Sequence, residues 1–257
     1  MNNKSIGFFD SGIGGITILN SIIKLLPNEN TIYLADSINS PYGNKCNDEL
    51  IKICKKNVEF LINSGCKLIV IACNTATTNS ISYLRQNYKI PFIGIEPAIK
   101  PAALNTKTGK IGVLATKGTL GSNLFEKTST LHGQNIEIIE KQVNGLVELI
   151  EKGIFSGSKI DILLEKYITP MINIGIDKLV LGCTHYPLVI NSIEKITKKT
   201  IEVIECSHPV ALQTKKILCS LNLENLEKTE IKNIFYTNGN DNILKAMLDE
   251  KFEIFKI

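Results

Sequence analysis

The chain has 257 residues, a hydrophobic fraction of 44% and a formal net charge of +4 at pH 7. This length suits one large or two medium domains, and the composition is typical of a globular protein rather than a disordered one. The positive surplus is small and scattered without a basic block, so we expect no nucleic-acid partner. The first apolar run, 6–9, is too short for a signal peptide, and no stretch could span a membrane. We therefore expect a cytoplasmic protein with no membrane partner.

Short apolar runs alternate with longer amphipathic segments. Strands are expected over residues 5–9, 31–35, 67–72, 90–95, 110–115, 136–140, 177–182, 201–205 and 233–236. These runs are rich in Ile, Val, Leu and Phe with little alternation, as strands are when both faces of a parallel sheet are buried. Helical periodicity indicates helices over 47–64, 119–131, 143–153, 158–175, 187–198, 208–221 and 240–249. The alternation predicts a doubly wound α/β fold.

The sequence also contains a faint internal repeat. Residues 65–75 and 175–185 both run from a glycine through a lysine-led apolar strand to a cysteine and a polar helix start. Upstream, residues 6–11 resemble residues 111–116 in the same order. Buried strands can resemble each other by chance, but the matching cysteines favour two similar parallel-sheet domains. We expect a pseudo-twofold relation between them, with the active site in between.

A domain boundary is expected near Glu96-Pro97, where an expected strand ends. Residues 97–206 then form the second domain. The remaining segment, 207–257, is too small for a domain of its own. It is expected to return to the first domain, which then comprises residues 1–96 plus 207–257.

Seven cysteines stand at positions 46, 54, 66, 73, 183, 206 and 219. An odd count, wide spacing and the lack of a Cys-x-x-Cys pair argue against a disulfide framework and against a zinc site. We expect free thiols, as in a reducing compartment, and no metal. Cys46, Cys54, Cys66 and Cys219 are interpreted as small buried hydrophobic side chains.

A glycine-rich loop, residues 10–15, opens the first helix. Thr17 stands where a dinucleotide-binding motif needs its third glycine, and no Walker sequence occurs, so we expect no nucleotide cofactor. The loop is interpreted as a place where backbone N–H groups approach a small anion at a helix start. Asp36 and Ser37 follow another expected strand and are interpreted as helix caps or turn residues.

Cys73 and Cys183 carry the functional hypothesis. Ligands bind beyond the carboxyl ends of the strands in open parallel sheets, and both cysteines stand at such ends, each before a helix start that lowers a thiol pKa. Two opposed acid/base groups are what a racemisation requires, since one removes the α-proton from one face and the other returns a proton to the opposite face. Asp10 and His185 are placed to orient or deprotonate these thiols.

The sequence resembles the glutamate racemases. The segments that carry the resemblance are FDSGIGG (9–15), SPYG (40–43), VIACNTAT (70–77), GIEPA (94–98) and LGCTHYPL (181–188). They cover most of the chain in the family's order. The resemblance implies two α/β domains, no cofactor, Cys73 and Cys183 as the two catalytic bases, and assistance from Asp10 and His185. It also implies a role in supplying D-glutamate for bacterial peptidoglycan.

The resemblance further implies a set of substrate contacts. The matching positions are Asp10, Ser11, Tyr42, Gly43, Asn74, Thr75, Thr116, Glu151, Thr184 and His185. Arg85 is the only arginine, so an arginine clamp is available once at most. Substrate carboxylates are therefore expected to be held by backbone N–H groups and by Ser, Thr and Asn side chains. A homodimer is expected.

Three alternatives stay open. The enzyme could act on aspartate or a related acidic amino acid instead of glutamate. The scaffold could serve as a non-catalytic interaction protein, against which the presence of both cysteines with Asp10 and His185 argues. Finally, Cys73 and Cys183 could form a redox disulfide.

Overall fold

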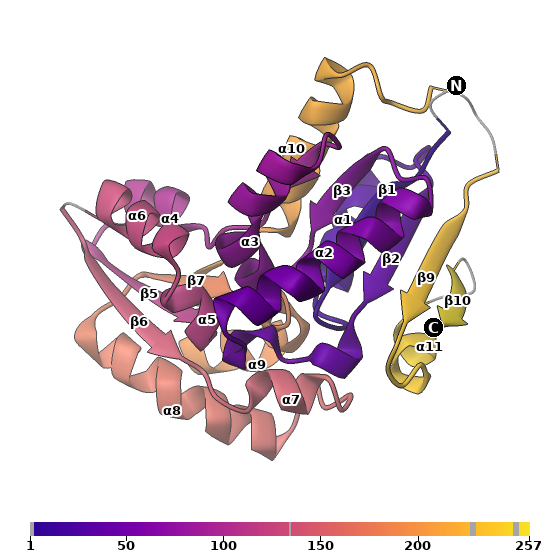
Figure 1. Cartoon of the computed structure of the whole chain (residues 1–257). Helices are drawn as coiled ribbons and strands as arrows, with labels where there is room; N and C mark the ends of the chain where they lie inside the picture. The colour runs from indigo at the N-terminus through magenta and orange to yellow at the C-terminus, as the bar shows by residue number, and fades with distance from the viewer. Residues whose placement is uncertain (1–2, 134, 227–229, 249–251) are drawn as a thin grey trace.

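Two parallel β-sheets form the frame of the molecule (Figure 1). The computed structural model describes residues 3–133, 135–226, 230–248 and 252–257. The first sheet has the strand order β10-β9-β2-β1-β3-β4 and the second has the order β6-β5-β7-β8, with all neighbours parallel. The strands are β1 Ile6–Asp10, β2 Thr31–Ala35, β3 Leu68–Ile71, β4 Phe92–Ile93, β5 Lys110–Ala115, β6 Glu137–Gln142, β7 Lys178–Gly182, β8 Glu202–Ile204, β9 Asn233–Thr237 and β10 Phe252–Lys256.

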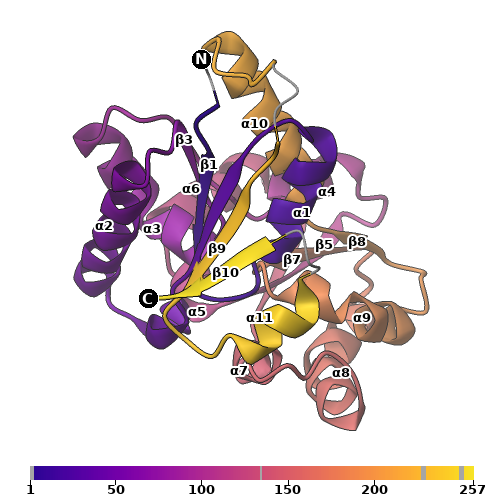
Figure 2. The same cartoon turned by 90° about the vertical axis from the view of Figure 1, so that its right-hand side faces the viewer.

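Helices cover both faces of the first sheet (Figure 2). The helices of the chain are α1 Ile16–Leu25, α2 Asn47–Asn63, α3 Asn74–Asn87, α4 Ile99–Asn105, α5 Lys117–Leu120, α6 Asn123–His132, α7 Leu146–Ile150, α8 Ser158–Ile174, α9 Ile190–Thr197, α10 Ser207–Ser220 and α11 Asn242–Met247. Phe9 of β1 lies in one buried cluster with Leu61 of α2, while Phe8 lies in another with Leu19 of α1 and Ala211 of α10. Successive residues of β1 thus pack on opposite faces of the sheet, so the strand carries no charged side chain before Asp10 at its carboxyl end.

The predicted α/β class and the internal repeat are confirmed by the strand order. The run β2-β1-β3-β4 of the first sheet has the same order as β6-β5-β7-β8 of the second. The repeated segments 6–11 and 111–116 lie on the equivalent strands β1 and β5, and the cysteine-containing segments follow β3 and β7. The two halves therefore place their cysteines at equivalent strand ends.

Several elements differ from the prediction. The expected helix 119–131 is two helices, because Gly121 ends α5 and the Ser122 hydroxyl caps α6 by accepting from Phe125 N. The expected helix 187–198 begins as the 3-10 helix Tyr186–Val189, and the expected helix 240–249 is seen over 242–247, while residue 249 lies outside the described residues. Strand β10 was not predicted, because it is half-exposed at an edge and lacks a long apolar run.

The C-terminal segment lies beside the first half of the chain (Figure 1). β9 pairs with β2, and α10 packs on α1. This placement supports the domain boundaries proposed from the sequence, which stay a prediction. Within the described ranges, no helix is both long and apolar enough to pass through a membrane.

A buried ion pair lies at the amino-terminal ends of the strands of the first sheet. The cysteine Cys73 lies at the opposite, carboxyl-terminal ends. Lys67 Nζ lies 2.5 Å from Glu29 Oε2, and both side chains are 3% exposed. Glu29 Oε1 also accepts a hydrogen bond of 2.8 Å from the Asn225 backbone N–H. The pair therefore ties the returning chain to the amino-terminal end of the sheet.

We predict that Lys67→Met lowers the free energy of unfolding by about 3–5 kcal/mol, because it removes this cation from a buried carboxylate. Lys195→Met is the matched control, since Lys195 pairs with Asp161 at the surface with its side chain 71% exposed, so its loss should lower the free energy of unfolding far less. Urea denaturation followed by circular dichroism measures both. Equal losses in the two variants would contradict the prediction.

Candidate active site

The two predicted thiols border a single cavity between the halves of the chain. Cys73 follows β3 and precedes α3, and Cys183 follows β7 shortly before a 3-10 helix over Tyr186–Val189. Both side chains are buried. The cavity between them has a volume of about 10 Å³. Its other lining residues are Ser11, Pro41, Tyr42, Gly43, Asn74, Thr75, Thr116, Val147, Thr184 and His185.

Most of the residues that the sequence predicted are thus brought together in the structure. Asp10 and Glu151 are not part of the cavity lining, but each contacts elements that form it. Gly15 N–H at the start of α1 donates to Asp10, and His185 contacts Glu151. Val147 and Pro41 also line the cavity and were not predicted as site residues. Val147 lies in none of the motifs, whereas Pro41 belongs to the SPYG segment, which was the available signal.

His185 connects Cys183 to Glu151. His185 Nδ1 lies 3.7 Å from Cys183 Sγ, and Nε2 lies 2.5 Å from Glu151 Oε1. Burial alone would lower the His185 pKa, but the interactions with Cys183 and Glu151 together raise that pKa well above its ordinary value. This rise in pKa favours the protonated form of the ring beside the Cys183 sulfur.

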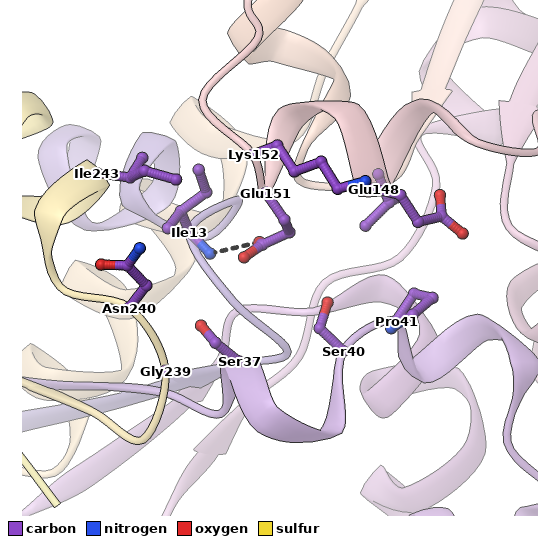
Figure 3. Close-up of a pocket in the computed structure, with 11 residues that line it drawn as sticks. Ile13, Ser37, Ser40, Pro41, Glu148, Glu151, Lys152, Gly239, Asn240 and Ile243 are labelled. Atoms are coloured by element: carbon purple, nitrogen blue, oxygen red, sulfur yellow. Dashed lines mark hydrogen bonds between the residues drawn. The ribbon is translucent and has the colours of Figure 1, made fainter.

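The glycine loop binds the chain's own carboxylate. Ile13 N–H donates to Glu151 Oε1 at 2.8 Å (Figure 3). A Cβ at Gly12 would lie 1.9 Å from Glu151 Oε1, and one at Gly14 would lie 2.5 Å from His185 Nδ1. Glycine is required at both positions so that these side chains can approach the backbone. In this structure the loop's backbone N–H group binds the carboxylate of Glu151 where the sequence predicted a small anion.

Cys73 lies beside a buried carboxyl group. Its sulfur is 4.0 Å from Ser11 Oγ. Burial and the charge of Asp10 raise the pKa of Cys73 well above its ordinary value, although the Ala76 N–H at the start of α3 opposes this rise. The expectation that the helix start lowers the Cys73 pKa is therefore wrong, because burial outweighs the helix dipole.

Asp10 is fully buried at the carboxyl end of β1. Its Oδ2 accepts from Gly15 N–H at 2.8 Å, while its Oδ1 accepts no hydrogen bond from the described part of the chain. Burial raises the Asp10 pKa to about 6, opposed by the positive charge of His185 and by the hydrogen bond from Gly15. Asp10 therefore has one free acceptor and titrates close to neutrality.

Three threonine hydroxyls form a cluster across the two halves. Thr75 Oγ1 lies 2.8 Å from Thr116 Oγ1 and 3.2 Å from Thr119 Oγ1, and the latter two are 3.1 Å apart. Thr75 opens α3, whereas the other two belong to the segment around α5. Thr119 was not predicted from the sequence, although its spacing of three residues from Thr116 was an available signal. Next to the cluster, the Asn74 side-chain amide is buried and has no acceptor among the described residues.

Tyr42 borders the cavity, but its hydroxyl is engaged elsewhere. Tyr42 Oη donates to Asp36 Oδ2 at 2.5 Å. Asp36 begins a turn, as the cap-or-turn interpretation allowed, since its carbonyl accepts from Asn39 N–H at 3.2 Å, but its carboxylate makes no capping hydrogen bond to the 3-10 helix Ser37–Asn39. Gly43 approaches the threonine cluster closely, since a Cβ there would lie 2.8 Å from Thr116 Cβ.

Beside the thiol cavity lies a larger pocket of about 300 Å³ (Figure 3). Ser37, Ser40 and Pro41 line one side of it. Glu148, Glu151 and Lys152 of the segment around α7 line another side, and Gly239, Asn240 and Ile243 complete the wall. Glu151 thus separates this pocket from His185.

The remaining cysteines are only partly as expected. All seven are free thiols, but Cys46 and Cys219 are exposed, so their interpretation as buried side chains is wrong. Each lies near the end of a surface helix, where the apolar character of a cysteine does not indicate whether its side chain is buried. In the part of the chain that the structure describes, no three His, Cys, Asp or Glu side chains converge in a way that could hold a metal ion.

The fold and the site define a class of protein. Two similar α/β halves each bring one thiol to a shared cavity, as an enzyme requires when it moves a proton between two faces of its substrate. The sequence model of Asp/Glu/Hydantoin racemase matches residues 24–211. The chain belongs to this family.

Named relatives resemble the whole chain. A glutamate racemase from Clostridium perfringens is 40% identical over 98% of this chain and 94% of that protein. The crystal structure of glutamate racemase from Francisella tularensis in complex with D-glutamate has a TM-score of 0.85 and 30% identity, covering 99% of this chain and 98% of that one. The Escherichia coli glutamate racemase, in complex with L-glutamate and the activator UDP-MurNAc-Ala, has a TM-score of 0.88 and 27% identity, covering 98% and 97%.

The raised Asp10 pKa predicts a specific pH dependence of stability. The pKa is about 6 in the folded chain against an ordinary 3.8, so the folded state binds the proton more tightly. The contribution of Asp10 is then fully present below about pH 4 and is lost as the pH rises through about 6. Asp10→Asn should remove this loss, so the variant gains stability over the wild type across that range, by up to about 3 kcal/mol.

Urea denaturation of both proteins in steps from about pH 4 to about pH 7 measures the difference in unfolding free energy. Comparing the two proteins cancels the titration of the other groups. A difference that stays constant with pH would contradict a raised Asp10 pKa.

Proposed function

We propose that the chain interconverts L-glutamate and D-glutamate, without a cofactor, by moving the α-proton between Cys73 and Cys183. The observation that carries the proposal is that two thiols from equivalent strand ends border the same cavity. The relatives and structural neighbours named as glutamate racemases support glutamate as the substrate. The reaction then supplies D-glutamate for peptidoglycan synthesis.

In each direction one sulfur acts as base and the other as acid. A thiolate takes the α-proton of bound glutamate, and the opposite thiol donates its proton to the other face of the α-carbon. One C–H bond breaks and another forms, and the two sulfurs exchange protonation states. The reverse reaction uses the same pair with the roles exchanged.

The partners of each thiol support this assignment. His185 Nδ1 lies 3.7 Å from Cys183 Sγ, within reach for proton exchange, and Glu151 fixes the ring through its other nitrogen. Burial favours the protonated form of Cys73, so this thiol is ready to donate. The free Oδ1 of Asp10 is suited to accept from the thiol of Cys73 or from the substrate ammonium group.

The polar wall of the cavity supports recognition of carboxylates without arginine. Arg85 Nη2 donates to the Phe92 carbonyl, and Arg85 is not among the residues that line the thiol cavity. The hydroxyl and amide groups available there belong to Ser11, Asn74, Thr75, Thr116 and Thr184. Such neutral donors, with backbone N–H groups at helix starts, can bind a carboxylate.

The proposal is tested by incubating L-glutamate with the pure protein in deuterium oxide without added cofactor. We expect loss of the circular dichroism signal and deuterium at the α-carbon of newly formed D-glutamate before it appears in the remaining L-glutamate. A change with aspartate but not with glutamate would show that the substrate is aspartate instead. No change with either, together with a reversible loss of two thiols on mild oxidation, would favour the redox alternative.

Cys73→Ser and Cys183→Ser should each lower kcat for racemisation by about 10²–10⁴-fold, because a hydroxyl is a much weaker acid than a thiol at neutral pH. Cys219→Ser is the matched control, since Cys219 is an exposed thiol outside the cavity. Far-UV circular dichroism checks that each variant is folded. Wild-type activity in a folded Cys73 or Cys183 variant would remove that thiol from the mechanism.

Glu151→Gln should lower kcat by about a hundredfold, because a neutral amide no longer stabilises the His185 imidazolium. Glu148→Gln, on the same short segment but exposed and without contact to His185, should keep wild-type kcat. Initial rates followed by circular dichroism compare the two. Equal kcat values would exclude Glu151 from the site chemistry.

We further propose a cytoplasmic homodimer with no nucleic-acid or membrane partner. The free state of all seven thiols supports a reducing compartment. The scattered charge of the sequence supports the lack of a nucleic-acid partner. The homodimer rests on the sequence-based expectation and is tested by light scattering of the pure protein.

A further inference from the structure

A buried polar network lies directly behind Tyr42. Its centre is Asp36, which is 2% exposed and follows β2. Besides Tyr42 Oη, its carboxylate accepts from Asn39 Nδ2 at 2.9 and 3.0 Å and from Asn238 Nδ2 at 2.6 Å. Asn57 Nδ2 of α2 donates to Tyr42 Oη at 2.9 Å. A carboxylate so deeply buried is stabilised by this set of charge-assisted hydrogen bonds.

Asn238 links this network to the C-terminal segment. It follows β9, the strand that pairs with β2. Its Nδ2 donates to Asp36, and its Oδ1 accepts from Ile38 N–H at 2.9 Å. The Asn238 side chain therefore binds both the Asp36 carboxylate and the backbone of Ile38 in the turn after β2, although it lies about two hundred residues further along the chain.

The segment after β2, which begins at Asp36, continues to the thiol cavity at Tyr42 and Gly43. Tyr42 and Gly43 begin the 3-10 helix Tyr42–Asn44, and both line that cavity. A Cβ at Gly118 would lie 3.2 Å from the Gly43 carbonyl oxygen, so the Gly43 backbone also packs closely on α5. The position of this wall depends on where the Tyr42 side chain is anchored.

We propose that Asp36 and Asn238 are positioning residues for the reaction, which fix the Tyr42–Gly43 wall of the substrate cavity through the Tyr42 hydroxyl. This inference rests on the proposed glutamate racemisation. Cys73 and Cys183 are held separately, at the ends of β3 and β7, so a loosened wall weakens substrate binding while the proton-transfer groups stay in place. The C-terminal segment thereby takes part in substrate recognition without touching the cavity.

The test compares Asn238→Ala, Asn238→Asp, Asp36→Asn and the double variant Asp36→Asn/Asn238→Asp. Asn238→Ala and Asp36→Asn should each raise KM for glutamate about tenfold with kcat changed less than about threefold. Asn238→Asp keeps the acceptor for Ile38 N–H but sets a second carboxylate against Asp36, so its KM should rise further. The double variant reverses donor and acceptor and should bring KM back to within about threefold of the wild type.

Asn240→Ala is the matched control, because Asn240 lies in the same turn, is exposed and makes no hydrogen bond to residues 36–43. Its KM should equal that of the wild type. A purely structural role would instead lower the melting temperature of the variants and leave KM unchanged, which would overturn the proposal. A double variant with a KM no better than that of Asn238→Asp would overturn it as well.

A second measurement separates this proposal from the proposed function. Amide hydrogen exchange over residues 37–44 should be faster in Asn238→Ala than in Asn240→Ala, and slow again in the double variant. If the wild type does not racemise glutamate but this exchange pattern holds, the proposed function fails while the positioning network stands. Unchanged exchange in Asn238→Ala would refute the network whatever the activity.

Discussion

The Glu151 carboxylate links the two halves of the site. One of its oxygens accepts from the Ile13 backbone in the first half and contacts the His185 ring that follows β7 in the second. These contacts are possible only because the loop after β1 has glycine at positions 12 and 14. The glycine-rich sequence, which resembles a phosphate-binding loop, is therefore explained by the approach of two protein side chains.

The symmetry of the fold does not extend to the electrostatics of the two thiols. β3 and β7 occupy equivalent places in their sheets, and each delivers a cysteine. Yet Cys73 lies near the carboxyl group of Asp10, whereas Cys183 lies next to the imidazole of His185. One sulfur therefore has an acidic side chain as its neighbour and the other a basic one, although the two strands that deliver them are equivalent.

The sequence was informative wherever the signal was local. Strands buried on both faces have an apolar run at their centre, so β1, β3, β5 and β7 could be located, and the repeat with its two cysteines followed from comparing them. Contacts between distant segments could not be predicted, because no pattern links Asn238 to Asp36 or Ile13 to Glu151. The direction of the Cys73 pKa shift was predicted wrongly, since burial and the charge of Asp10 outweigh the hydrogen bond from the start of its own helix.

The cavity between the two thiols has a volume of only about 10 Å³. Such a space accommodates roughly one water molecule, and no amino acid fits in it. A molecule larger than water can therefore enter between the two sulfurs only if the lining side chains or the two halves of the chain shift. In this arrangement both thiols are buried and have little contact with bulk water, which slows the exchange of their protons with the solvent.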